Sequence, residues 1–211
     1  YSWSNGATTA SIANLAPALY TLTITDADNV SSSKTFKVMN KVAWKNLNGV
    51  TLQSNDRLIK TDQTDNNNSG WGSSRSYLPA GQDGELIINT TTIPNNSIIG
   101  FSAHPILFTP NYTGNLINYG GFFGGNYFHV YEGGGEMTYN NKLYGGNEFR
   151  IARETNAQTG VTEIAYYLNG QELRRVPTQL NQDLFVLFIS KNWPQKTFME
   201  IGVGDGIEIS N

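Results

Sequence analysis

Hydrophobic and polar residues alternate in short runs along most of this chain. Residues 19–25 alternate with period two, and residues 34–38 form a shorter run that can return against them. Residues 149–153 and 161–168 form two further runs, separated by a polar stretch. No charged, leucine-rich amphipathic stretch of helical length is present. The pattern therefore predicts antiparallel β-strands joined by polar turns.

The dipeptide Asn169-Gly170 follows the run 161–168 and precedes another run, residues 171–176. Asn-Gly is the dipeptide that best tolerates the two positive φ angles of a type I′ hairpin turn. This part of the chain is thus predicted to form an antiparallel meander without a crossover helix. Such a meander is typical of a β-sandwich.

Further strands are predicted across the rest of the chain. They cover residues 42–44, 58–61, 84–89, 97–102, 116–123, 127–132, 184–190 and 198–204. Residues 62–72, with the sequence DQTDNNNSGWG, are predicted to form a long polar loop. Many short strands with turn signals between them favour two stacked antiparallel sheets.

Composition narrows the classes of function. The chain has 211 residues, a net charge of −3 and no cysteine. This charge gives no electrostatic footprint for nucleic acid, and no run of about 18 apolar residues is present for insertion into a membrane. The lack of cysteine excludes a disulfide framework, a thiolate zinc site and a cysteine nucleophile. Residue 1 is Tyr rather than Met, so we read the chain as a fragment and infer no location from a missing signal peptide.

Residues 1–38 differ in character from the rest and carry three motifs. These are YSWSNGATT at 1–9, IANLA at 12–16 and YTLTITDA at 20–27. Together they resemble the later half of the SprB-type repeat of bacterial surface and gliding adhesins, which is a small immunoglobulin-like sandwich. The resemblance implies an extracellular or cell-surface bacterial protein and a spacer role for this segment. The piece is too small to bury a core by itself, and the sequence leaves open whether it folds alone or borrows a strand from a neighbour.

The remainder of the chain carries a second series of short motifs. In chain order they are Trp44, 48–50 (NGV), 58–61 (LIKT), 70–72 (GWG), 83–86 (DGEL), 99–102 (IGFS), 117–119 (INY), 129–134 (HVYEGG) and 167–170 (YLNG). The series resembles a bacterial module of the concanavalin A-like, jelly-roll class, whose relatives are attached to glycan-active or adhesive proteins. The expected fold is therefore all-β, with a partial immunoglobulin-like repeat at residues 1–39. An antiparallel β-sandwich of the jelly-roll, concanavalin A-like type is expected at residues 41–211.

Aromatic side chains are the main candidates for ligand contact, because the C–H bonds of sugar rings stack on aromatic faces. Trp71 stands between glycines in the predicted polar loop, where little can bury it. By contrast, Trp44, Phe101 and Phe185 lie in strand runs and are predicted to pack in the core. The predicted glycan-binding set is Trp71, Trp193, Tyr112 and Tyr127 for stacking, with Arg75, Asn118, Asn126 and Arg150 for hydrogen bonds.

The sequence thus favours a non-catalytic module that binds a polysaccharide or cell-surface glycan and requires no cofactor. A protein partner for the same exposed aromatic residues is the alternative. A glycoside hydrolase or lyase is less favoured, because such a hydrolase needs two carboxyl groups facing one cleft. Glu132 and Glu136 both lie near turns, and the strand signature of two glutamates in retaining jelly-roll enzymes is absent.

Calcium is a more plausible metal than zinc, because sandwich modules often hold a structural Ca²⁺ through loop oxygens. The loop acids that could supply these oxygens are Asp62, Asp65, Asp83 and Asp205. No Asp-x-Asp-x-Asp loop is present, and capping of turns explains the same acids more simply.

Glycine pairs are the last pattern in the sequence. Gly120-Gly121 and Gly124-Gly125 flank two phenylalanines, and residues 133–135 are three consecutive glycines. Glycines let a ligand or a second backbone approach closely. Hairpin turns are the favoured interpretation of all three.

Overall fold

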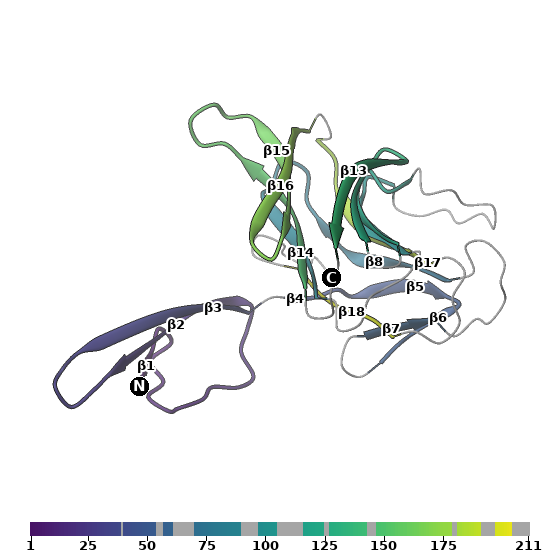
Figure 1. The fold of residues 1–211 in the computed structure, drawn as a ribbon. Coiled ribbons are helices and arrows are strands. Elements are labelled where there is room, and N and C mark those ends of the chain that lie inside the picture. The colour runs from purple at the N-terminus through teal and green to yellow at the C-terminus, as the bar shows by residue number, and fades with distance from the viewer. Residues whose placement is uncertain are drawn as a thin grey trace. The chain divides into compact units, whose positions relative to one another are not determined.

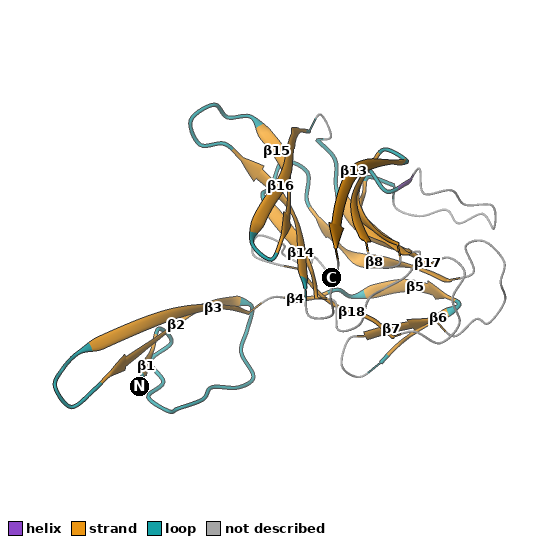
Figure 2. Ribbon diagram, viewed as in Figure 1, coloured by secondary structure: helices purple, strands orange, loops and turns teal. Residues whose placement is uncertain are grey.

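The computed structural model of the chain describes residues 1–38, 40–53, 57–60, 70–89, 97–104, 116–124, 127–142, 147–178, 181–190 and 197–203. These residues form β-strands and the turns between them, with no α-helix among them (Figures 1 and 2). The chain divides into two compact units, Tyr1–Asn40 and Lys41–Asn211. The predicted all-β class is confirmed.

The first unit is a three-stranded antiparallel sheet. It consists of β1 (Ser2–Trp3), β2 (Ala18–Thr25) and β3 (Ser31–Val38), in the order β1-β2-β3. Both alternating runs predicted here are confirmed, although the second strand begins earlier than predicted because Ser31, Ser32 and Ser33 also pair with β2. Asp26 shapes the turn between β2 and β3, since its carboxylate accepts the backbone N–H groups of Asp28 and Val30, both at 2.9 Å.

One sheet of the second unit has seven strands in the order β13-β12-β11-β10-β17-β8-β5. The bounds of these strands are β5 Trp44–Asn48, β8 Gly70–Leu78, β10 Ser97–Ser102, β11 Tyr119–Gly124, β12 Tyr127–Glu132, β13 Gly135–Lys142 and β17 Leu184–Ser190. All neighbouring strands whose register is known run antiparallel.

The other sheet of the second unit has eight strands, seven of them in the order β16-β15-β14-β9-β18-β7-β6. Their bounds are β6 Val50–Leu52, β7 Arg57–Lys60, β9 Gly84–Asn89, β14 Glu148–Thr155, β15 Thr162–Leu168, β16 Gln171–Pro177 and β18 Thr197–Val203. The short β4 (Asn40–Lys41) completes it. The meander predicted from the alternating runs is β14-β15-β16, and the φ angles of Asn169 and Gly170 are 51° and 79°, as a type I′ turn requires.

The core of the second unit lies between these two sheets. Because side chains alternate along a strand, every second residue points inward, and these inward residues form one apolar cluster with members from both sheets. Phe128 of β12 and Phe149 of β14 meet across the sandwich with ring centroids 4.3 Å apart. The predicted core positions of Phe101 and Trp44 are confirmed, since both belong to this cluster or pack against it.

One charged side chain, Arg153, is almost completely buried, with 1% of its surface exposed. Its guanidinium donates hydrogen bonds to the backbone carbonyls of Pro79, Gln82 and Gln182. Burial lowers its pKa, while the charges of Asp83 and Asp183 act in the opposite direction. Arg153 therefore joins two connecting segments, at Pro79–Gln82 and Gln182, by satisfying carbonyls that have no strand partner.

Four sequence predictions about this unit differ from the structure. Residues 70–72 were predicted as the end of a loop but belong to strand β8, which continues to residue 78. Strand β13, residues 135–142, was not predicted. Gly120 and Gly121 lie inside β11, whereas Gly133 and Gly134 do form a turn, with φ angles of 55° and 95°. Phe185 points away from the core and packs on Tyr77, with ring centroids 5.4 Å apart. Strand β8 was not predicted because buried serines occupy positions where apolar residues would have shown the alternation of a strand.

Candidate ligand-binding site

The outer face of the seven-stranded sheet, turned away from the core, carries a row of side chains that crosses six strands. The strand registers place these residues side by side. Residues next to them in sequence point into the core, so the row itself points outward. The row is Asn48, Trp71, Ile189, Ile98, Phe122 and His129. Outward-facing positions of a solvated sheet are usually polar, so this largely apolar row needs a physical reason.

The middle of the row is buried. Ile98 and Ile189 are only 5% and 1% exposed, and they belong to a second apolar cluster with Ile117, Tyr131 and Leu187. Leu116 and Phe122 pack against this cluster. The outer face is therefore partly covered by the chain segment that holds Leu116 and Ile117.

Gly120 allows the segment with Leu116 and Ile117 to pack closely on strand β11. A Cβ atom on Gly120 would stand 2.7 Å from Cγ2 of Ile117 and 2.8 Å from the carbonyl oxygen of Ile99. Only glycine leaves room for Ile117 at this point on β11. The glycine pair here thus permits close approach of a second chain segment, which is the interpretation that the sequence favoured less.

Asn118 fixes the same segment. Its side-chain oxygen accepts the N–H of Ala103 at 2.8 Å, and its own backbone N–H donates to the carbonyl of Phe101 at 2.9 Å. Its carbonyl accepts the N–H of Gly133 at 3.1 Å. Asn118 was predicted to bind a ligand, and its side-chain oxygen helps to hold residues 116–118 against the sheet.

The row ends in an accessible aromatic group formed by Phe122, Tyr127 and His129. The rings of Phe122 and His129 lie 6.1 Å apart on adjacent strands, and both side chains are half-buried. Tyr127, two residues before His129 on the same face of β12, is 46% exposed. Among the described residues, Nδ1 of His129 is buried without a hydrogen-bond partner. We call these three residues the Phe122–Tyr127–His129 group.

Trp71 lies toward the other end of the row. It is a half-buried residue of β8, opposite Ile189 on β17 and Asn48 on β5. The predicted placement of Trp71 in an open loop is therefore wrong. Strands β8 and β12 are separated by three others, which at a normal strand spacing is about 19 Å. Trp71 and Tyr127 share one face but cannot contact the same sugar ring.

Of the remaining predicted binding residues, Arg75 and Arg150 are described, and they lie on different sheets. Arg75 is exposed at an irregularity of β8, where its N–H donates to the carbonyl of Ala43. Arg150 lies on the outer face of the other sheet. Trp193, Tyr112 and Asn126 lie outside the described residues.

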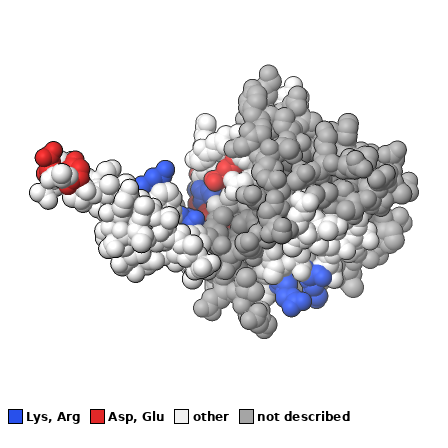
Figure 3. All heavy atoms as spheres, turned by 90° about the horizontal axis from the view of Figure 1, so that it is seen from below, with Lys and Arg blue, Asp and Glu red and all other residues white. Residues whose placement is uncertain are grey.

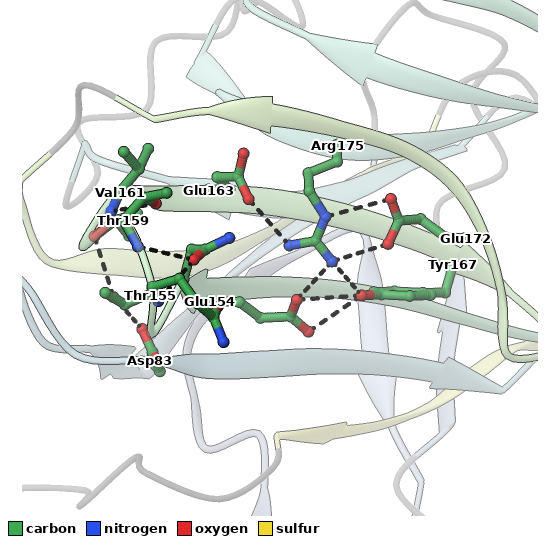
Figure 4. A network of polar contacts seen from close by, with 12 residues as sticks. Asp83, Glu154, Thr155, Thr159, Val161, Glu163, Tyr167, Glu172 and Arg175 are labelled. Carbon is green, nitrogen blue, oxygen red and sulfur yellow. Dashed lines mark hydrogen bonds and ion pairs between the residues drawn. The ribbon is translucent and has the colours of Figure 1, made fainter.

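The outer face of the eight-stranded sheet carries an ionic network, shown in Figure 4. Arg175 of β16 pairs with Glu154 and Glu172, both at 2.8 Å, and with Glu163 at 3.4 Å. The hydroxyl of Tyr167 also accepts a hydrogen bond from Arg175 and donates to Glu154. Hydrogen bonding from Arg175 holds the pKa of Glu172 below its ordinary value.

Arg150 extends this network. Its guanidinium lies 3.6 Å from the centroid of the Tyr167 ring and donates to Glu85 at 2.7 Å. Burial acts to lower its pKa, but the hydrogen bond and charge of Glu85, with the charges of Tyr167 and Glu154, outweigh this and raise it. Arg150 is thus engaged by its own sheet and does not share a site with Tyr127 or Trp71.

The described glutamates do not form a free catalytic pair. Glu132 is held by Arg174 through two hydrogen bonds of 3.0 Å, between the two sheets. The pKa of Tyr166 is raised, chiefly because its hydroxyl is buried and secondly because the carboxylate of Glu132 is close by. The side chain of Glu136 lies outside the described part of the structure. Glu132, Glu154, Glu163 and Glu172 are each engaged by an arginine, whereas a glycoside hydrolase needs two available carboxyl groups facing one cleft.

Asp83 is the one predicted calcium ligand within the described residues. It is exposed, and its carboxylate accepts a hydrogen bond from the hydroxyl of Thr155 at 2.8 Å. Asp62, Asp65 and Asp205 lie outside the described residues. No cluster of three or more His, Cys, Asp or Glu side chains suited to a metal occurs in the part of the chain that the structure describes.

The distribution of charged residues and the hydropathy of the described residues bear on binding to nucleic acid and to membranes. The face drawn in Figure 3 shows separate basic and acidic groups among its described residues, not one continuous basic surface. Within the described residues, no helix is long and apolar enough to cross a membrane.

No family model matches this chain, and no curated protein does. Among solved structures, a human SPRY domain superposes with a TM-score of 0.51 at 11% identity, covering 78% of this chain and 99% of that domain. The lumenal domain of VIP36, bound to Ca²⁺ and Man3GlcNAc, has a TM-score of 0.48 at 9% identity and covers 76% of this chain and 82% of that one. Peanut lectin has a TM-score of 0.48 at 10% identity, with 90% and 97% covered. At these identities the likeness concerns the fold alone, and the second unit is an antiparallel β-sandwich of two sheets.

Proposed function

We propose that the second unit is a non-catalytic glycan-binding module of an extracellular or cell-surface protein, carried by the first unit as a spacer. The observation that carries the proposal is the Phe122–Tyr127–His129 group on the outer face of the seven-stranded sheet. Two adjacent strands hold these rings, so the group is rigid, and Tyr127 is 46% exposed. A rigid aromatic platform with one apolar face and one polar edge suits a sugar ring.

His129 contributes a polar ring to this platform. Its buried Nδ1 is without a partner among the described residues. A buried unpaired polar atom is costly, and in native proteins such atoms are usually satisfied by water or a ligand. Since this atom has almost no accessible surface, a sugar hydroxyl would meet that need only after the His129 ring turns toward the ligand.

The carboxylates argue against a hydrolase on the same fold. Glu85, Glu154, Glu163 and Glu172 all pair with arginines on the opposite sheet, and Glu132 pairs with Arg174. Catalysis would require one protonated and one free carboxyl group facing the same ligand. Binding without bond cleavage is therefore the function that these residues support best.

The test is retention of the chain on insoluble polysaccharides and on a glycan array, with and without calcium. Tyr127→Ala should abolish retention and leave the thermal midpoint nearly unchanged, because the side chain is largely exposed. Tyr1→Ala removes a tyrosine that is 59% exposed in the other unit, and serves as the matched control.

Three results would count against the proposal. Equal retention by Tyr127→Ala and the unchanged chain would remove the Phe122–Tyr127–His129 group from the site. Calcium-dependent retention would move the site toward the loop acids. Absence of retention on every glycan would instead favour a protein partner for the exposed aromatic residues.

A further inference from the structure

Strand β3 ends the sheet of the first unit. It pairs with β2 over its whole length of eight residues, and no strand among the described residues follows it on its other side. Its side chains are exposed from Ser31 to Lys37. A long edge strand of this kind presents a row of N–H and C=O groups that can pair with another chain.

The two faces of this sheet are different, which limits how another strand can align. One face carries a ladder of hydroxyl pairs, Thr21–Thr35, Thr23–Ser33 and Thr25–Ser31, each 2.8–2.9 Å long. The other face carries apolar side chains, with Trp3 packed 5.8 Å from Phe36 and Nζ of Lys34 standing 5.4 Å from the Phe36 ring. A partner strand must therefore continue a hydroxyl face on one side and an apolar face on the other.

We infer that the edge of β3 pairs with the same edge of a second copy of this chain, antiparallel and centred on Thr35. Directly opposite residues in an antiparallel pair share a face. Centring on Thr35 keeps the hydroxyl face of one copy beside that of the other. The four central residues of the hydroxyl row would then be Thr21, Thr35 and the same two residues of the second copy.

The two lysines of β3 restrict the register, and the contact between Lys34 and Phe36 favours centring on Thr35. Centring the pair on Lys34 would place the two Lys34 side chains directly opposite each other, and like charges in that position are destabilising. Centring on Thr35 sets Lys34 opposite Phe36, whose ring it already approaches within its own chain, and sets Lys37 opposite Ser33. A lysine on an edge strand discourages unspecific pairing. Here the charges disfavour registers centred on a lysine, and of the registers that remain, the one centred on Thr35 sets Lys34 beside the Phe36 ring.

Cysteine crosslinking tests the register directly, because the chain contains no cysteine of its own. Opposite Cβ atoms in an antiparallel pair are about 4.5–5.5 Å apart, close to the span of a disulfide. Thr35→Cys should therefore form a covalent dimer under mild oxidation. Thr21→Cys, on the same face but on the inner strand β2, is the matched control and should remain monomeric.

The neighbouring positions complete the test. Lys34→Cys alone and Phe36→Cys alone should not crosslink, whereas a mixture of the two variants should form a mixed dimer. A covalent dimer of Lys34→Cys alone would show a different register and overturn the inference. Absence of crosslinking by Thr35→Cys would overturn it as well.

Sedimentation of the chain without cysteine gives an independent result. The dimer fraction should rise with concentration, and Thr35→Lys, which sets two new charges opposite each other, should raise the dissociation constant at least tenfold. The thermal midpoint of Thr35→Lys checks that the variant is folded. A chain that stays monomeric at all concentrations would contradict the inference.

Discussion

The two outer faces of the sandwich obey the same alternation of side chains but are filled with opposite chemistry. On the seven-stranded sheet the outward positions hold isoleucine, phenylalanine, tryptophan and histidine, and the central ones are buried. On the eight-stranded sheet they hold arginines and glutamates joined in the network of Figure 4. Charged groups satisfy one another and face water, whereas an apolar row must be covered by protein or ligand. The difference directs the search for a ligand to the seven-stranded sheet.

The largest expected effect comes from the buried centre of the apolar row. Ile98→Ala should lower the free energy of unfolding by about 2–5 kcal/mol, because it removes apolar contacts and leaves a cavity. Denaturant unfolding measures the effect. Glu163→Ala, at an outward position of the other sheet, is the control and should cost less than about 1 kcal/mol. Equal losses at the two positions would show that the faces do not differ in this way.

Gly120 tests the cover over the same row. Gly120→Ala should destabilise the protein by about 1–3 kcal/mol, since the new Cβ would overlap Ile117 and the carbonyl of Ile99. Gly135→Ala is the matched control, because the nearest atom to a Cβ there is 3.8 Å away. If both changes prove neutral in thermal unfolding, Ile117 does not pack on Gly120 as described.

Arg175 tests the charged face. Arg175→Ala should cost about 1 kcal/mol at low salt, because Glu154, Glu163 and Glu172 lose their shared partner and repel one another. The loss should shrink as salt is added. Lys45→Ala, an exposed lysine on β5, should change little. In a double variant, Glu163→Ala should recover part of the loss, and a strictly additive result would argue against coupling.

The smallest expected effect concerns acid. The pKa of Glu172 is lowered in the folded chain, so its pairing with Arg175 stabilises the fold above the unfolded value near 4.3. This contribution is lost as pH falls through the lower, folded pKa. The carboxylate is 43% exposed and screened by water, so the effect is small. Glu172→Gln should flatten the acid side of the thermal midpoint plotted against pH, and an unchanged slope would contradict the pairing.

The sequence predicted the strands whose residues alternate clearly. Residues 84–89, 97–102 and 127–132 were predicted as strands, and the structure has β9, β10 and β12 there. The Asn169-Gly170 turn was also predicted correctly, since its backbone angles depend on local chemistry. Strand β8 was missed, because serines stand where the period needs apolar residues. There the hydroxyl of Ser74 accepts the N–H of Val186 and that of Ser76 accepts the N–H of Ala43, both in the irregular part of the strand.

The candidate site combines predicted and unpredicted residues. Tyr127 was predicted to contact a ligand and is exposed. Trp71 and Arg150 were grouped with it, but Trp71 lies on a distant strand of the same sheet and Arg150 on the other sheet. The grouping failed because residues far apart in sequence become neighbours only through strand order. The alignment of Phe122 with His129 could have been predicted from the sequence, because only two residues separate the strands that carry them. The continuation of the row to Trp71 could not, because it depends on the order of distant strands.

By itself the sequence determined the all-β class, the turns and the alternation that gives each strand an inner and an outer side. These properties are local, since they depend on backbone preferences and on residues two positions apart. The tertiary structure alone decided which outer sides became apolar and covered, which became charged, and which side chains meet. Those outcomes depend on pairing between distant strands, whose register no local pattern specifies.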